Sequence, residues 1–117
     1  MSKGQQIYEK AKQYLGKPYV YGAEGPDSFD CSGFVKYVLK QFGINVPHSS
    51  DSIFKGGKAG TGAAGDVVCW NGHCGFCDGT GKVCHAYGST NGSVKINNIA
   101  DCSRWDNRKV LGYRRYW

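Results

Sequence analysis

Cys31 combines the residue type and the setting needed for nucleophilic chemistry on an amide. It follows Asp30 and precedes Ser32-Gly33, at the point where an apolar helical stripe begins. Unpaired N–H groups and the helix dipole at a helix N-terminus stabilise negative charge and lower the pKa of a thiol. The same N–H groups can stabilise the oxyanion that forms when a thiolate attacks an amide. Cys31 is therefore the candidate nucleophile, and the alternative interpretation is a buried structural cysteine.

Two histidines supply the base and its orienting group, since a cysteine nucleophile needs both. The segment Asp78-Gly79-Thr80 lies midway between His73 and His85 and is typical of a hairpin turn. A turn centred on Gly79 places the two histidines directly opposite each other, with Cβ atoms about 4.5–5.5 Å apart. One imidazole can then hold the tautomer of the other. The alternative is that each is an ordinary histidine of a sheet.

The same register places Cys74 opposite Cys84, on the face of the hairpin away from the histidines. We expect the two cysteines to be buried as small apolar side chains and to ligate no metal. A cross-strand disulfide is the alternative if the protein works outside the cell.

The elements that must position these residues follow from periodicity. Apolar residues at helical spacing predict a helix over 7–15, ended by Gly16-Lys17-Pro18. A second helix is predicted from Cys31 to Phe42, capped by Asp30 and ended by Gly43, and one helical turn is expected around Ile53. Strands are predicted at 66–70, 73–77, 82–86, 94–96 and 109–116, with turns at Asp78-Gly79 and Asn91-Gly92. The fold class is α+β, with N-terminal helices packed on an antiparallel sheet of about five strands.

Six cysteines leave two further interpretations open. Full disulfide pairing would staple the chain, but it is incompatible with a free nucleophile. A zinc module is suggested by the density of Cys and His between 73 and 85, although adjacent strand residues such as His73 and Cys74 point to opposite faces.

Length and composition indicate one globular domain spanning 1–117, with 40% hydrophobic residues and 18 glycines. The formal net charge of +6 is scattered along the chain, which favours a solvated basic surface over a binding site for nucleic acid, acidic lipids or another anionic polymer such as a cell wall. No apolar run is long enough to span a membrane. The segment 1–6 is polar and lacks an apolar signal core, so we expect either that the protein is not exported by that route or that the sequence is a mature form.

The order of motifs resembles that of the NlpC family of bacterial cell-wall peptidases, which are papain-like. The segment 16–22 (GKPYVYG) is similar to the family's lead-in, and 29–35 (FDCSGFV) closely resembles its nucleophile motif. The segment 65–68 (GDVV) resembles the next strand, 73–76 (HCGF) the base motif and 83–86 (VCHA) the third-residue motif. The resemblance covers nearly the whole chain.

The resemblance implies a Cys31–His73–His85 triad in a single NlpC-type catalytic domain. It implies a cysteine endopeptidase that cuts peptidoglycan stem peptides between γ-D-glutamyl and diaminopimelate or lysine. The residues expected to hold the peptide are Tyr19, Asp30, Ser32, His48 and Ser49. No metal or organic cofactor is needed. The expected partner is peptidoglycan or a muropeptide, with no nucleic acid and no membrane span, and the chain is expected to be a monomer acting outside the cell.

The chain departs from the family pattern at several positions. Ala23 replaces a second glycine, and His48 stands where the family often has arginine, just after Pro47. Cysteines occupy positions that are usually apolar or tyrosine, and we expect none of the accessory wall-binding domains that are common in the family. The alternatives are therefore an amidase or acyltransferase on the same fold, or a catalytically inactive binding domain.

Overall fold

A computed structural model describes residues 1–88, 92–105 and 107–117. The helices of these described residues are α1 (Lys3–Lys12), α2 (Cys31–Lys40), α3 (Ser50–Lys55) and α4 (Ile99–Trp105). The strands are β1 (Lys58–Ala59), β2 (Val67–Trp70), β3 (His73–Cys77), β4 (Lys82–Tyr87), β5 (Ser93–Asn98) and β6 (Val110–Arg115). They form one antiparallel sheet in the order β1-β6-β2-β3-β4-β5. No helix of the described part is both long and apolar enough to cross a bilayer.

Helix α2 forms where the apolar stripe predicts it. Asp30 is the N-cap, and its Oδ1 accepts a hydrogen bond of 2.6 Å from the Gly33 N–H, which satisfies one of the unpaired donors of the first turn. The helix ends at Lys40, slightly before the predicted Phe42, and Gly43 follows with a φ of 76°. The buried face of the helix packs on the sheet through Phe34, Val35, Val38 and Leu39.

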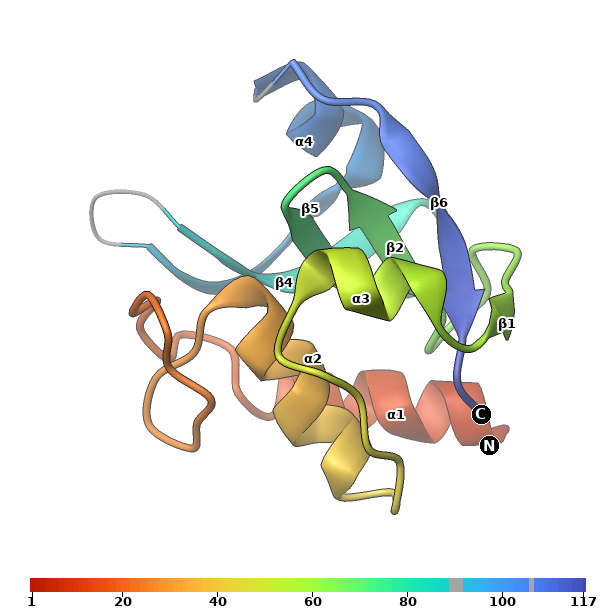
Figure 1. The fold of residues 1–117 in the computed structure, drawn as a ribbon, viewed down its shortest axis with the longest axis horizontal. Helices are drawn as coiled ribbons and strands as arrows, with labels where there is room; N and C mark the ends of the chain where they lie inside the picture. The colour runs from red at the N-terminus through yellow and green to blue at the C-terminus, as the bar shows by residue number, and fades with distance from the viewer. Residues whose placement is uncertain (89–91, 106) are drawn as a thin grey trace.

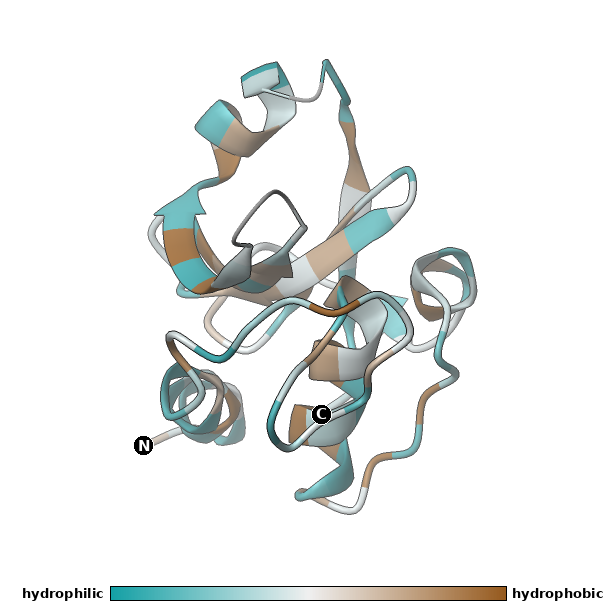
Figure 2. Cartoon of the chain, turned by 90° about the vertical axis from the view of Figure 1, so that its left-hand side faces the viewer, coloured by the Kyte–Doolittle hydropathy of each residue, from teal (hydrophilic) through white to brown (hydrophobic). Residues whose placement is uncertain are grey.

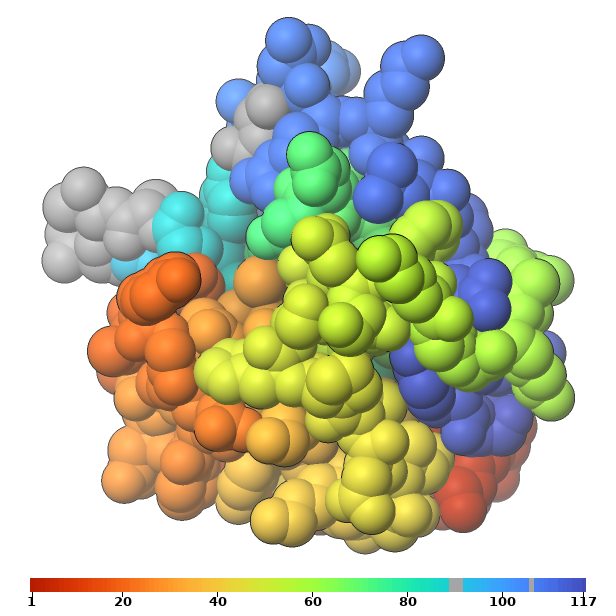
Figure 3. Space-filling model, in the orientation of Figure 1, coloured from red at the N-terminus to blue at the C-terminus, as the bar shows by residue number. Residues whose placement is uncertain are grey.

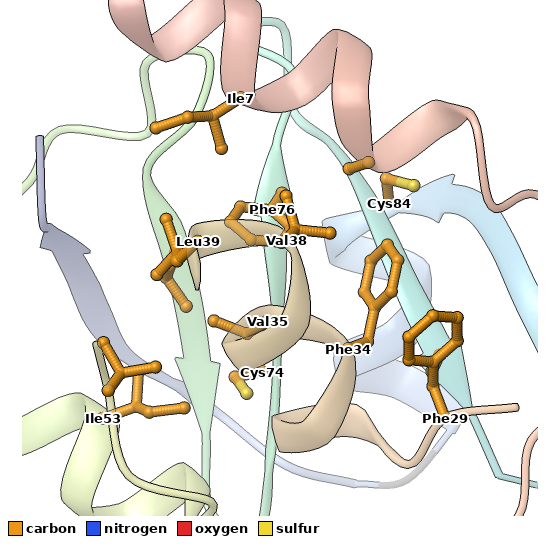
Figure 4. Packing of buried hydrophobic residues seen from close by; sticks show 14 of the residues in the cluster. Ile7, Phe29, Phe34, Val35, Val38, Leu39, Ile53, Cys74, Phe76 and Cys84 are labelled. Carbon is orange, nitrogen blue, oxygen red and sulfur yellow. The ribbon is translucent and has the colours of Figure 1, made fainter. Parts of the chain in front are cut away.

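The core lies on both faces of the sheet. Helices α1 and α2 lie on one side of the strands and α4 lies towards the other (Figure 1). The larger cluster fills the α1–α2 side, where Phe34 meets Phe76 of β3 at a ring distance of 5.8 Å (Figure 4). The smaller cluster includes Trp70 of β2 together with Ile99 and Cys102, which α4 itself contributes. Apolar and polar bands alternate along the helices, as expected for elements that are buried on one side only (Figure 2).

The β3–β4 hairpin has a different register from the one predicted. Phe76 pairs with Cys84 and Cys77 with Val83, so the turn is centred on Thr80 and not on Gly79. The reason is the Asp78 side chain, which accepts hydrogen bonds from the Thr80 N–H at 2.7 Å and the Lys82 N–H at 3.1 Å. These bonds stabilise a longer turn than the two-residue type.

The predicted opposition of Cys74 and Cys84 is therefore wrong. Cys74 instead pairs across the strands with Cys69 of β2, and Cys84 pairs with Phe76. Both cysteines are nevertheless fully buried in the larger cluster, on the face away from the histidines. None of the six cysteines, all of which lie among the described residues, forms a disulfide.

The α+β class, with helices packed on an antiparallel sheet, is confirmed. The sheet has six strands because the turn-rich segment before residue 61 contributes the two-residue strand β1, which pairs with the end of β6. Helix α4 was not predicted. The turn expected at Asn91-Gly92 includes Asn91, which lies outside the described residues.

Candidate active site

Cys31 is the first residue of α2 and stands at the edge of a cleft. Its Sγ lies 3.7 Å from the carbonyl oxygen of Gly72, in the turn that joins β2 to β3. Arg108 donates a 2.7 Å hydrogen bond to the carbonyl of the neighbouring Asn71. The nucleophile candidate thus lies between a helix N-terminus and a turn that a distant side chain holds in place.

The surroundings of Cys31 favour the thiolate. Hydrogen bonds from the Cys74 thiol and from His73 oppose the effect of burial and lower the pKa of Cys31 to about 5. Cys74 is buried beside Val35 of α2 (Figure 4). The hydrogen bond with Cys31 and complete burial both raise the pKa of Cys74. Cys74 is therefore a neutral donor to a negatively charged neighbour, and a hydrogen bond to a charged group is stronger than one between neutral groups.

His73 of β3 and His85 of β4 are hydrogen-bonded, with 2.7 Å between His73 Nε2 and His85 Nδ1. His73 is 6% exposed and His85 is fully buried. Trp70 packs on the His73 ring at 5.4 Å, and Tyr87 stacks on the His85 ring at 5.4 Å. The predicted contact between the histidines is present, although the predicted register is not.

Gly75 explains how the two histidines meet in the observed register. A Cβ at Gly75 would lie 2.6 Å from the Cβ of His85, so Gly75 stands beside His85 where the prediction placed His73. His73 lies two residues before Gly75 on the same face of β3 and reaches His85 diagonally, a distance that aromatic side chains can span. The missing side chain at Gly75 leaves the space for this diagonal contact.

The five residues expected to hold a peptide lie around one cleft of about 430 Å³, together with Cys31. They come from the loop before α2, the start of α2 and the segment leading into α3. Figure 3 shows these segments meeting on one face, coloured orange to yellow-green, with the β2–β3 turn in green beside them. The lining residues are Tyr19, Tyr21, Gly22, Asp30, Cys31, Ser32, His48, Ser49, Ser50 and Gly72.

Within this cleft Asp30 organises its neighbours. Its carboxylate accepts hydrogen bonds from the Gly22 N–H at 3.0 Å, from the Gly33 N–H at 2.6 Å and from Ser32 at 3.4 Å. His48 Nε2 lies 2.8 and 2.9 Å from the two carboxylate oxygens. Asp30 is 8% exposed, so it contributes to the cleft chiefly through the groups that it holds.

Three of the other lining side chains have distinct settings. His48 is half-buried and also approaches Glu24, with 3.6 Å between Nδ1 and Oε2. Ser49 caps α3, because its hydroxyl oxygen accepts a 3.3 Å hydrogen bond from the Ser52 N–H. The Tyr19 ring packs against Gly88, where a Cβ would come within 2.8 Å of it.

Sequence reasoning missed the part that Cys74 and Gly72 play around Cys31. Cys74 follows His73 in the chain, and strand alternation points it to the helix side of the sheet, where α2 begins. That alternation was visible in the sequence, but the position of α2 over this point of β3 was not. Among the described residues, no group of three or more His, Cys, Asp or Glu side chains is arranged to hold a metal ion.

The sequence of this chain is similar to that of known proteins. The family model described as "NlpC/P60 family" matches residues 16–114. A probable endopeptidase p60 of Listeria grayi is 38% identical over 101 residues, which cover 80% of this chain and 19% of that protein. The probable endopeptidase Cgl2188 of Corynebacterium glutamicum is 36% identical over 95 residues, 76% of this chain and 46% of its own length. The chain thus spans less than half of these curated relatives.

Solved structures agree with the sequence match. NlpC2 of Trichomonas vaginalis superposes with a TM-score of 0.86 at 24% identity, covering 97% of this chain and 47% of that one, which shows the shared fold. The NlpC/p60 domain of the peptidoglycan hydrolase SagA superposes with a TM-score of 0.74 at 30% identity, covering 93% of this chain and 97% of that one. With 99 consecutive residues matched by the family model, this chain belongs to the NlpC/P60 family.

Proposed function

We propose that this chain is a cysteine endopeptidase that hydrolyses an amide bond in the stem peptides of peptidoglycan, outside the cytoplasm. The observation that carries the proposal is the geometry of the site: Cys31 is the first residue of α2, and His73 Nε2 lies 2.7 Å from Nδ1 of the buried His85. Cys74 and His73 lower the pKa of Cys31, which favours its thiolate. Relatives named as endopeptidases, and a structural neighbour described as a peptidoglycan hydrolase, support this choice of reaction and substrate.

The proposed reaction is acyl transfer in two steps. The Cys31 thiolate attacks the scissile carbonyl carbon, and the backbone N–H of Cys31, which has no intrahelical acceptor, stabilises the oxyanion. The C–N bond breaks as protonated His73 gives its proton to the leaving amine. His73 then takes a proton from water, the resulting hydroxide attacks the thioester, and the carboxylic acid leaves Cys31.

The proposed scissile bond joins γ-D-glutamyl to diaminopimelate or lysine. The motif resemblance of 29–35, 73–76 and 83–86 to the family supports this choice. Tyr19, Asp30, Ser32, His48 and Ser49 are proposed to position the stem peptide from the walls of the cleft that contains Cys31.

Digestion of defined muropeptides tests the proposal. Matched muropeptides with diaminopimelate or lysine at the third position are incubated with the protein and with Cys31→Ala, and the products are weighed by mass spectrometry. We expect a fragment that ends in D-glutamate from the unaltered protein and none from Cys31→Ala. Cleavage at the bond between the sugar and the peptide would indicate an amidase instead. Turnover by Cys31→Ala would exclude the thiol mechanism.

A further inference from the structure

A fourth polar residue continues the line that starts at Cys31. His85 Nε2 lies 2.9 Å from the side-chain oxygen of Asn97 on β5. Asn97 is half-buried, whereas His85 is fully buried, so bulk water does not reach the imidazole. An amide oxygen can only accept a hydrogen bond. The hydrogen of neutral His85 must therefore be on Nε2.

This constraint passes from His85 to His73. A neutral imidazole with its hydrogen on Nε2 has a lone pair on Nδ1. His85 Nδ1 is the atom that meets His73 Nε2 at 2.7 Å, so His73 must donate from Nε2. The remaining nitrogen of neutral His73, Nδ1, then carries the lone pair. It is the nitrogen available to take a proton from Cys31.

A competing interaction at His85 is weaker. The Cys102 sulfur of α4 lies 3.9 Å from the same Nε2 atom. A thiol donating to Nε2 would require the opposite tautomer of His85, and His73 would then carry its hydrogen on Nδ1. The hydrogen bond from Nε2–H to the amide oxygen, at 2.9 Å, is stronger than a hydrogen bond from the Cys102 thiol to Nε2, because S–H is a weak donor and the distance is 3.9 Å. Asn97 therefore sets the tautomer.

We infer that Asn97 is a positioning residue, which fixes the tautomers of His85 and His73 so that His73 Nδ1 acts as the base towards Cys31. The inference rests on the proposed function for its catalytic consequence but not for the tautomers themselves. When His73 becomes protonated during the reaction, the same Asn97 oxygen faces the positive end of the histidine pair and stabilises it.

The ionisable groups around this pair come from several elements. Tyr87 stacks on His85, and Lys95 lies over the Tyr87 ring at 6.0 Å. Among the described residues, Cys102 of α4 also lies near the pair, and Lys82 and Asp101 line the same hollow as Asn97. Within this hollow the Asn97 side-chain oxygen meets His85 Nε2 at 2.9 Å.

Nuclear magnetic resonance of the ring nitrogens tests the tautomers without any substrate. The chain has three histidines, so ¹⁵N-histidine labelling gives an assignable spectrum with His48→Gln as a reference. The spectra are recorded on the Cys31→Ala protein at about pH 8.5, where ordinary imidazoles are neutral. We expect Nε2–H tautomers for both His73 and His85, and a mixture of tautomers after Asn97→Leu. A His85 with its hydrogen on Nδ1, or unchanged tautomers in Asn97→Leu, would overturn the inference.

Kinetics on a muropeptide test the catalytic consequence in the protein that retains Cys31. Asn97→Leu should lower kcat about three- to tenfold, the cost of one lost hydrogen bond, and should leave KM unchanged because Asn97 does not line the cleft. Asn98→Leu is the matched control: Asn98 is exposed, lies on the opposite face of β5 and bonds Asp101. An unchanged kcat in Asn97→Leu, or an equal loss in Asn98→Leu, would contradict the positioning role. Failure of the unaltered protein to cut any muropeptide would refute the proposed function and leave the tautomer result to stand or fall separately.

Discussion

The low pKa of Cys31 predicts selective alkylation of this thiol at mildly acidic pH. The depressed pKa means that the thiolate forms as the pH rises through about 5. At pH 6 such a thiol is roughly nine-tenths ionised, whereas one with the ordinary value of 9.0 is about one-thousandth ionised, a ratio of about 900. Intrinsic nucleophilicity falls with pKa, which over four units costs about 40- to 100-fold. Cys31 should therefore react roughly ten- to twentyfold faster than an exposed ordinary cysteine.

The other cysteines widen this difference. Burial raises the pKa of Cys69 and of Cys84 to about 12, and both are fully buried. Burial also raises the pKa of Cys77. At pH 6 these thiols are almost entirely protonated and inaccessible, so the reagent should label one site.

The assay is limited alkylation with iodoacetamide between about pH 4 and 9, followed by peptide mapping. The Cys31 rate should be half-maximal near pH 5 in the unaltered protein. Cys74→Ala removes the thiol that donates to Cys31 and should move the midpoint upward. Cys69→Ala is the matched control, because Cys69 is the buried cross-strand neighbour of Cys74 and does not contribute to the Cys31 pKa.

Two results would refute the reasoning. Preferential labelling of Cys77 or Cys102 at pH 6 would show that Cys31 is not the activated thiol. Equal shifts of the Cys31 midpoint in Cys74→Ala and Cys69→Ala would show that loosening of the core, and not the Cys74 hydrogen bond, controls the pKa of Cys31.

Three further predictions concern the histidine pair, the packing at Gly75 and the ion pair between Asp66 and Arg115. His73→Ala should lower muropeptide turnover more than His85→Ala, because the base moves the proton while the second histidine orients it; equal or reversed losses in kcat would show that the roles are exchanged. Gly75→Ala should unfold at lower temperature and lose turnover, because the added Cβ would lie 2.6 Å from the Cβ of His85; unchanged melting and kcat would contradict the diagonal packing. Although burial alone would raise it, hydrogen bonds from Arg115 and from backbone N–H groups lower the pKa of Asp66 below its usual 3.8. The stabilisation by Asp66 is therefore present above about pH 4 and is lost as the pH falls below it. Arg115→Met leaves the buried Asp66 carboxylate without its cation and should lower the free energy of unfolding at pH 7 in chemical denaturation; a loss that is the same at pH 3 would count against the ion pair.

Local sequence patterns were sufficient for the elements that carry the chemistry. The apolar stripe from Phe34 to Leu39, the Asp30 cap and Gly43 together predicted α2, because helical period, capping and termination are encoded within a few residues. The five longer strands were also predicted from local signals, in their case strand-forming residues bounded by turn residues. Helix α4 was missed because its seven residues carry little signal by themselves, and Ile99 and Cys102 stabilise it only by packing under the sheet.

The sequence by itself therefore determined the order of the elements, the place of Cys31 at a helix start and the presence of His73 and His85 on two neighbouring strands. Only the tertiary structure decided how those strands align. The Asp78 side chain lengthens the turn, and each residue of β3 therefore pairs two positions further along β4 than predicted. The tertiary structure also decided that Cys74 lies against Cys31 and that Asn97 meets His85. These contacts join residues far apart in the chain, and their geometry depends on strand register and on the packing of helix against sheet, which no local pattern specifies.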